Sequence, residues 1–121
     1  MEKIRVLLVD DEGELITTMV ERLEYRGVEA DFAVSGIEAL EKIKKSQFDV
    51  VVVDLKMPGM SGTEIIKKVQ AEHPGIPILL MTGHGISLED EDIPPGIFDY
   101  LPKPINLEEL IIKMREAIGR V

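Results

Sequence analysis

One stretch, residues 48–62 (FDVVVVDLKMPGMSG), constrains the fold of this chain more than any other. Its run of valines ends at the carboxylate of Asp54, and the loop that follows contains Pro58, Gly59 and Gly62. A strand buried on both faces is continuously apolar rather than alternating, and this pattern is typical of parallel sheets. Open parallel sheets bind their ligands beyond the carboxyl ends of the strands. Asp54 is therefore predicted to lie where such a fold binds ligands.

Segments of strand character alternate with segments of helical character along the whole chain. The predicted strands are residues 4–9, 28–34, 49–53, 78–81 and 97–101. Apolar residues at helical spacing predict helices over 12–26, from Ser35 to about Lys45, from Ser61 or Gly62 to the breakers at 73–75, and from Asn106 onward. Ser35 followed by Glu38 is typical of a capping box.

The segment between strand four and strand five is the weakest part of this pattern. Two glycines stand near its start and two prolines near its end. Both residue types disfavour a helix interior, and short helices are marginal on their own. We therefore expect a short or irregular fourth helix, at most over residues 87–92.

This alternation predicts an α/β fold in a single domain, residues 1–121. Its expected form is a doubly wound, five-stranded parallel sheet with helices on both faces and right-handed crossovers. In the flavodoxin-like strand order 2-1-3-4-5, strands one and three are neighbours at the switch point where ligands bind.

Composition excludes several classes of function. Lys and Arg number 14 and Asp and Glu 23, so the net charge of −9 argues against direct nucleic-acid binding. No apolar run approaches the ~20 residues of a membrane span, and the N-terminus lacks the apolar core of a signal peptide. Cysteine is absent, which excludes disulfides and thiolate metal sites. The expected location is the cytoplasm, without membrane insertion.

Polar residues of chemical interest stand at the ends of the predicted strands. Asp10 and Asp11 follow strand one, Asp54 follows strand three, Thr82 follows strand four and Lys103 follows strand five. Carboxylates that converge raise one another's pKa, and a hard divalent cation such as Mg²⁺ removes the conflict while keeping room for phosphate oxygens. A lysine and a hydroxyl suit a phosphoryl group, and an aspartate can serve as its covalent acceptor. The set predicts metal-assisted phosphoryl transfer onto Asp54.

Simpler interpretations exist for each residue. In these interpretations Asp10 and Asp11 cap the first helix, which is a common role for aspartate. Asp54 would be an ordinary loop acid, and Thr82 would be a turn residue. Lys103 is the hardest to dismiss, because prolines on both sides hold it in place. The functional interpretation is favoured because independent simple explanations must otherwise coincide at four strand ends.

The motifs together resemble the response-regulator receiver domain of two-component signalling. They are Asp10-Asp11, Asp54 before Met-Pro-Gly-Met-Ser-Gly, Thr82-Gly83, and Tyr100-Leu101-Pro102-Lys103-Pro104, in order and at the expected spacing. The resemblance implies a phosphoacceptor that is not an enzyme but assists its own phosphorylation and dephosphorylation. It further implies a sensor histidine kinase or phosphotransfer protein as the donor, and an output domain or partner protein as the recipient of the signal.

The resemblance also implies a role for each matching residue. Asp54 is the implied phosphoacceptor, and Thr82 and Lys103 contact the phosphoryl oxygens. Tyr100 is the aromatic that changes rotamer with Thr82, and the Lys103–Pro104 bond is cis. The implied ligands of Mg²⁺ (or Mn²⁺) are Asp10, Asp11, Asp54 and the backbone carbonyl of Lys56.

Two rival functions remain open from the sequence. A small metal-dependent phosphohydrolase would need a general acid near Asp54 and a cap over the site, and the sequence indicates neither. A degenerate module with the same fold and no phosphorylation is the second rival. The complete set of acids, threonine and lysine argues against it, whereas the unusual fourth helix leaves it open.

Overall fold

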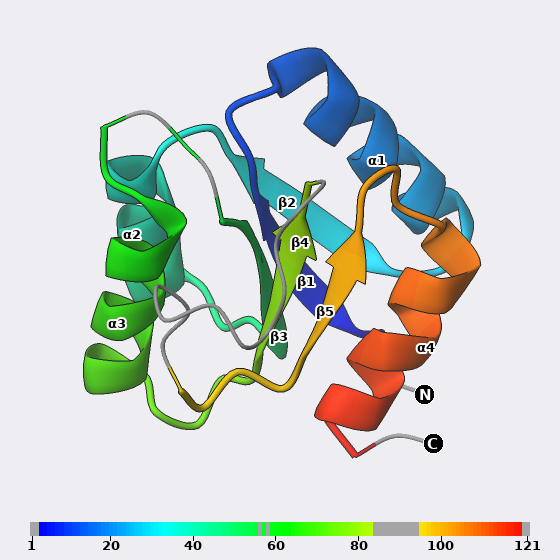
Figure 1. Ribbon diagram of the computed structural model, residues 1–121. Coiled ribbons are helices and arrows are strands. Elements are labelled where there is room, and N and C mark those ends of the chain that lie inside the picture. Colours follow the sequence, from blue (N-terminus) through cyan, green and yellow to red (C-terminus); the bar gives the residue numbers. More distant parts are fainter. Residues whose placement is uncertain (1–2, 56, 58, 84–94, 120–121) are drawn as a thin grey trace.

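The computed structural model describes residues 3–55, 57, 59–83 and 95–119 (Figure 1). The expected fourth helix over 87–92 lies outside these residues. The described elements, in chain order, are β1 (Arg5–Val9), α1 (Gly13–Tyr25), β2 (Glu29–Ala33), α2 (Gly36–Lys45), β3 (Val50–Asp54), α3 (Gly62–Glu72), β4 (Ile78–Thr82), β5 (Asp99–Pro102) and α4 (Leu107–Ala117).

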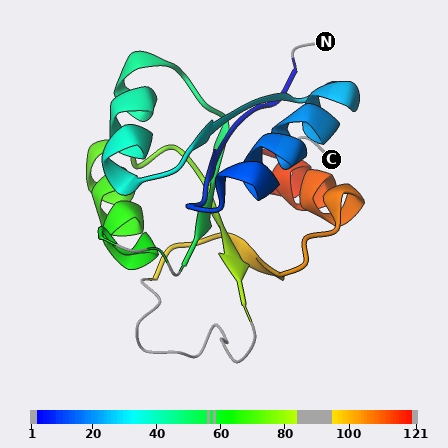
Figure 2. The same ribbon diagram turned by 90° about the horizontal axis from the view of Figure 1, so that it is seen from above.

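The strands form one parallel sheet in the order β2-β1-β3-β4-β5, which confirms the predicted topology. Helices α1 and α4 cover one face, and α2 and α3 cover the other, as Figures 1 and 2 show from two directions. Val9 lies opposite Val53, and Thr82 lies opposite Pro102. The carboxyl ends of the strands therefore meet at one edge of the sheet, at the top of Figure 1.

The valine run at the centre of the sheet behaves as its composition predicts. All residues of β3 are buried, and their side chains alternate between the two faces. Val51 and Val53 pack with Ile65 and Ile66 of α3. Val50 and Val52 belong to the core that contains α1 and α4. Each fully buried side chain of this size stabilises the fold by roughly 1.5–3 kcal/mol, so Asp54 stands on a firmly packed strand.

The N-termini of α2 and α3 are capped by serine side chains. Ser35 Oγ accepts a hydrogen bond from the N–H of Glu38 at 3.2 Å, as predicted. The Glu38 carboxylate lies 3.4 Å from Lys42 Nζ, and this ion pair takes the place of the predicted return bond of a capping box. A complete capping box occurs instead at Ser61 and Glu64, which begins α3 beside the end of β3.

Strand five begins later than predicted, at Asp99 rather than at residue 97. Gly96, with a φ of +93°, turns the chain just before it. The N–H of Phe98 donates to the carbonyl of Ile78 at 2.8 Å, so pairing with β4 starts in this turn before regular strand geometry does.

Candidate functional site

Buried polar side chains mark the carboxyl edge of the sheet. Asp10, Asp54 and Thr82 are 0%, 6% and 2% exposed, respectively. Asp10 directly follows β1, and its Oδ1 accepts the N–H of Glu12 at 3.0 Å. Helix α1 begins at Gly13 with Glu12 at its N-cap, so the interpretation of Asp10 and Asp11 as helix caps is wrong. Asp10 is thus a buried carboxylate directly after β1.

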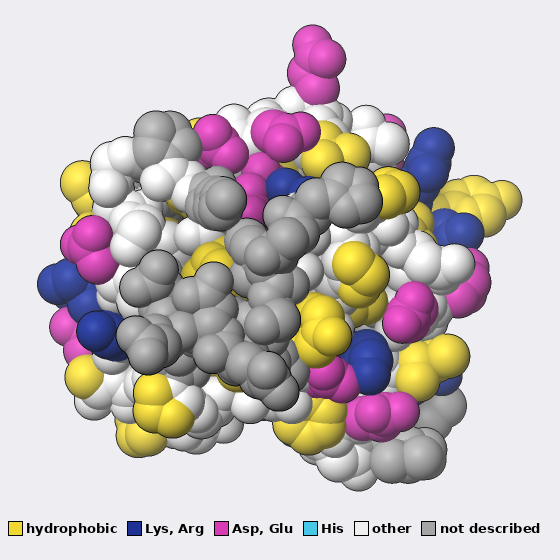
Figure 3. Space-filling model, in the orientation of Figure 1, with side chains coloured by type: hydrophobic (Ala, Val, Ile, Leu, Met, Phe, Trp, Pro, Cys, Tyr) yellow, Lys and Arg dark blue, Asp and Glu magenta, His cyan; other side chains and the backbone are white. Residues whose placement is uncertain are grey.

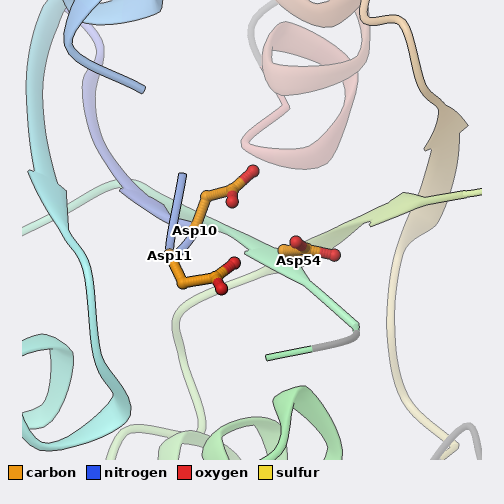
Figure 4. A group of neighbouring side chains, drawn as sticks. All are labelled: Asp10, Asp11 and Asp54. Carbon is orange, nitrogen blue, oxygen red and sulfur yellow. The ribbon is translucent and has the colours of Figure 1, made fainter. Parts of the chain in front are cut away.

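Asp10, Asp11 and Asp54 converge, as predicted from the strand ends. Each offers one carboxylate oxygen within 4.8 Å of the others, and Figure 4 shows them gathered where β1 and β3 end. Asp10 and Asp54 are buried, whereas Asp11 is exposed. This donor set consists of hard oxygen ligands open to water on one side. It fits Mg²⁺, which takes few carboxylates and keeps several waters.

Lys103 lies between the two buried carboxylates. Its Nζ is 3.0 Å from Asp10 Oδ2 and 3.0 Å from Asp54 Oδ2. Burial alone would lower the pKa of Lys103, but the hydrogen bonds and charges of Asp10 and Asp54 outweigh it and raise the pKa above its usual value. The ammonium therefore stays charged and offsets part of the negative charge that the fold gathers here.

The backbone around Lys103 is held to the end of β4. The N–H of Lys103 donates to the carbonyl of Thr82 at 2.7 Å, and Thr82 Oγ1 donates to the carbonyl of Leu101 at 3.5 Å. The Lys103–Pro104 peptide bond is cis, as the resemblance implied. These contacts place the lysine and the threonine hydroxyl at the same end of the sheet.

Tyr100 and Thr82 lie on the same side of the sheet. Tyr100 pairs in register with Leu80, two residues before Thr82, and side chains two residues apart on a strand share a face. Tyr100 is partly buried against the core beneath α2 and α3. This placement is compatible with the implied coupling of the two side chains, which remains a prediction.

Asp99, next to Tyr100, joins β5 to α4. Its carboxylate accepts a hydrogen bond from Lys113 of α4 and another from the N–H of Tyr100. Burial alone would raise the pKa of Asp99, but the bonds from Lys113 and from the Tyr100 N–H outweigh it, so its pKa lies below the usual value. Asp99 is thus more stable as an anion in the folded protein than in the unfolded chain.

An Asp99→Asn variant is expected to lose about 1 kcal/mol of unfolding free energy at pH 7. Because folding lowers the pKa of Asp99, this contribution is present above its unfolded pKa of about 3.9 and disappears as the pH falls through the folded pKa. Urea denaturation of both proteins across this pH range measures the difference. A difference that stays the same under strongly acidic conditions would contradict the ion pair as its cause. Lys113→Gln is the matched control and should give the same loss at pH 7.

Gly62 allows α3 to begin against the end of β3. A Cβ at this position would lie 2.5 Å from the carbonyl oxygen of Asp54 and 2.7 Å from Leu55 Cα. The N–H of Gly62 donates to the carbonyl of Leu55 at 3.2 Å. The helix start therefore packs on the backbone that carries Asp54, and a side chain at position 62 would push the two apart.

A Gly62→Ala variant is expected to lose about 1–3 kcal/mol of unfolding free energy, because the added methyl group overlaps backbone atoms that cannot move freely. Gly13→Ala is the matched control, since Gly13 is also the first residue of a helix and a Cβ there meets no atom within 4 Å. Urea denaturation compares the two. Equal stability of the two variants would show that the contact at Gly62 is not tight.

Some predicted and functional residues fall elsewhere. Lys56, the implied carbonyl ligand, lies outside the described residues. Glu12 was missed: its Oε1 lies 3.9 Å from Lys103 Nζ, so a further carboxylate reaches the site. Its position directly after Asp10 and Asp11 was the sequence signal that could have identified it.

Of the helices that the structure describes, none combines the length and apolar character needed to span a bilayer.

Comparison with known proteins agrees with this geometry. The response regulator receiver domain family matches residues 6–115. The chain is 34% identical over 118 residues to response regulator MprA of Mycobacterium sp. (strain KMS), covering 97% of this chain and 51% of the relative. It is 33% identical over 119 residues to the transcriptional regulatory protein ZraR of Klebsiella oxytoca, covering 98% of this chain and 27% of that protein. The chain thus spans about half or less of these relatives.

Solved structures show the same fold over nearly the whole chain. A response regulator receiver domain protein from Clostridium thermocellum superposes with a TM-score of 0.85 at 32% identity, covering 97% of this chain and 95% of that one. Chemotaxis protein CheY4 of Vibrio cholerae gives a TM-score of 0.86 at 32% identity, covering 96% and 99%. Fold, site geometry and family match agree, and the chain belongs to the response regulator receiver domain family.

Proposed function

We propose that Asp54 is the residue that accepts a phosphoryl group in this receiver domain. One observation carries the proposal: the Asp54 carboxylate is buried at the end of β3, beside two further aspartates and within hydrogen-bond distance of Lys103. A carboxylate oxygen of Asp54 attacks phosphorus, and an oxygen–phosphorus bond forms. The bond between phosphorus and the imidazole nitrogen of a phosphohistidine breaks, and its electron pair stays on that nitrogen.

Lys103 and Thr82 are assigned to the transferred group. The ammonium of Lys103, 3.0 Å from Asp54 Oδ2, needs only a short movement to pair with a phosphoryl oxygen instead. The Thr82 hydroxyl is held to the Leu101 carbonyl by a long bond of 3.5 Å, so little is lost when it donates to the phosphoryl group. Movement of the Thr82 side chain would leave space beside it for the Tyr100 ring. The new position of the ring would change the surface around β5.

Asp10, Asp11 and Asp54 are the proposed holders of Mg²⁺ (or Mn²⁺), together with the carbonyl of Lys56. The bound ion would supply positive charge to the oxygens of the group being transferred. Without it, Lys103 is the cation that the described part of the site holds against Asp10 and Asp54. We assign no turnover of external substrates to the chain, and only its own phosphorylation and dephosphorylation.

The proposed partners follow from the family. A sensor histidine kinase or a phosphotransfer protein donates the phosphoryl group, and an output domain or a partner protein receives the signal. The whole chain, residues 1–121, acts as one receiver unit in the cytoplasm. Its net charge of −9 supports a domain that does not itself bind nucleic acid.

Incubation with Mg²⁺ and a small phosphodonor such as acetyl phosphate tests this proposal. Intact-mass analysis should show a gain of one phosphoryl group per chain, and omission of Mg²⁺ should suppress it. An unchanged mass in the presence of both reagents would contradict the proposal. Steady release of phosphate from an external phosphate ester would favour the phosphohydrolase instead.

A further inference from the structure

Glu12 brings a carboxylate to the open side of the site. Its Oε1 lies 3.9 Å from Lys103 Nζ, which in turn lies 3.0 Å from Asp54 Oδ2. These two distances place Glu12 Oε1 within about 7 Å of the Asp54 oxygen. The side chain of Glu12 is 62% exposed, whereas that of Asp54 is 9% exposed. Glu12 therefore occupies the outer rim, close to where a phosphodonor must approach.

Contacts of its backbone fix the position of Glu12 beside the site. Its N–H donates to Asp10 Oδ1 at 3.0 Å, and Asp10 Oδ2 is bound to the same Lys103 that Glu12 contacts. Glu12 is also the N-cap residue of α1, so α1 restrains its backbone. Figure 3 shows acidic side chains gathered at the top edge of the molecule, which is the carboxyl end of the strands in Figure 1.

The charges of the described site do not cancel when Glu12 is included. If Mg²⁺ were held by the aspartates, it and Lys103 would together carry three positive charges, which match the three aspartates of the cluster. The negative charge of Glu12 then has no matching positive charge. Lys103 lies 3.9 Å from it but does not neutralise it, because two nearer carboxylates share the same ammonium. A phosphodonor, itself an anion, meets this uncompensated charge at the rim.

On the basis of the proposed function, we propose that Glu12 is a specificity-determining residue that selects phosphodonors by their charge. It disfavours small, highly charged donors in proportion to their negative charge. A protein-borne phosphohistidine carries the same kind of phosphoryl charge, but a cationic protein surface presented to the rim offsets this penalty. Glu12 acts through space and is neither a metal ligand nor the acceptor.

The test compares wild type with Glu12→Gln at saturating Mg²⁺, using dianionic acetyl phosphate and monoanionic phosphoramidate. At about 7 Å in water, loss of one charge speeds the reaction about two- to threefold for each negative charge on the donor. We therefore expect about a two- to threefold gain with phosphoramidate and about a four- to ninefold gain with acetyl phosphate at low ionic strength. The donor concentration that gives half the maximal rate should fall in Glu12→Gln, whereas the maximal rate should stay the same. The gain should vanish at about 1 M salt, where the screening length is about 3 Å.

Mg²⁺ affinity provides a second readout that does not depend on phosphorylation. Titration followed by backbone amide NMR shifts should show a modest loss of affinity in Glu12→Gln that disappears at high salt. In Asp11→Ala, by contrast, the loss should persist at high salt because a ligand is missing. Glu21→Gln is the control for net charge, since Glu21 lies on α1 nine residues further on, roughly 13 Å along the helix axis.

The outcomes separate this inference from the proposed function. A wild-type protein that takes up no phosphate contradicts the function of the site. A wild-type protein that is phosphorylated, with Glu12→Gln equally fast for both donors at low salt, overturns only the role of Glu12. An affinity or rate difference that persists at high salt would also overturn it, because a through-space charge cannot act under those conditions.

Discussion

An Asp54→Asn variant is expected to take up no detectable phosphate from acetyl phosphate in the presence of Mg²⁺. The substitution keeps the shape of the side chain but replaces the attacking carboxylate with an amide, which is not a nucleophile at neutral pH. The loss should exceed about a thousandfold, because the other carboxylates of the site do not occupy the position of Asp54 at the end of β3. Intact-mass analysis after incubation measures the result.

The variant should nevertheless fold. Removing one of several neighbouring carboxylates relieves their mutual repulsion, so its unfolding free energy without Mg²⁺ should equal or exceed that of the wild type. Asp49→Asn is the matched control. Asp49 lies just before the other end of β3, and its Oδ2 accepts the N–H of Arg5 at 2.9 Å, a bond that asparagine can keep. An Asp54→Asn protein that still gains one phosphoryl group would place the acceptor elsewhere.

A Lys103→Ala variant is expected to have two defects that can be measured separately. Phosphorylation by acetyl phosphate should fall about a hundredfold, since the ammonium that pairs with the transferred oxygens is gone. In metal-free buffer the unfolding free energy should fall by about 1–3 kcal/mol. Asp10 and Asp54, which are 0% and 6% exposed, then lose the cation that lies 3.0 Å from each.

Mg²⁺ should restore much of the lost stability of Lys103→Ala but little of its phosphorylation. The metal replaces the missing positive charge beside the carboxylates, whereas it cannot occupy the place of the lysine beside the phosphoryl oxygens. Lys68→Ala, which removes an exposed lysine from α3, is the control for net charge. If the two alanine variants were equally stable in metal-free buffer, the pairing of Lys103 with Asp10 and Asp54 would not contribute to the fold.

The fold was predictable from the sequence because its strongest signals are local. The valine run of β3, buried at every position, indicates a central parallel strand without knowledge of any contact. Alternation and crossover handedness predict a doubly wound parallel sheet, and the order 2-1-3-4-5 was taken from the flavodoxin-like form of that fold. The first residue of a strand was less predictable where the conformation of a single glycine determines it. The turn at Gly96, with a φ of +93°, delays β5 to Asp99 although the apolar pattern starts earlier.

The convergence of the aspartates was predictable, but Glu12 and the contacts of Lys103 were not. Parallel strands end at one edge, so Asp10, Asp54 and Thr82 had to converge there. The distances of Lys103 and Glu12 depend on side-chain torsions that a sequence does not encode locally. The capping box at Ser61 and Glu64 corresponds to a local Ser-x-x-Glu pattern in the sequence. The close approach of Gly62 to β3 depends on tertiary packing alone.

The central claim is that the phosphoryl group is carried by Asp54, and direct chemical location of the modified side chain is the most direct measurement. Borohydride reduces an acyl phosphate to an alcohol, so a phosphorylated aspartate becomes homoserine. After incubation with acetyl phosphate and Mg²⁺, reduction and proteolysis, mass spectrometry should find homoserine at position 54 and nowhere else in the chain. Homoserine at another aspartate, or phosphate retained on a serine, threonine or histidine while position 54 remains aspartate, would contradict the assignment.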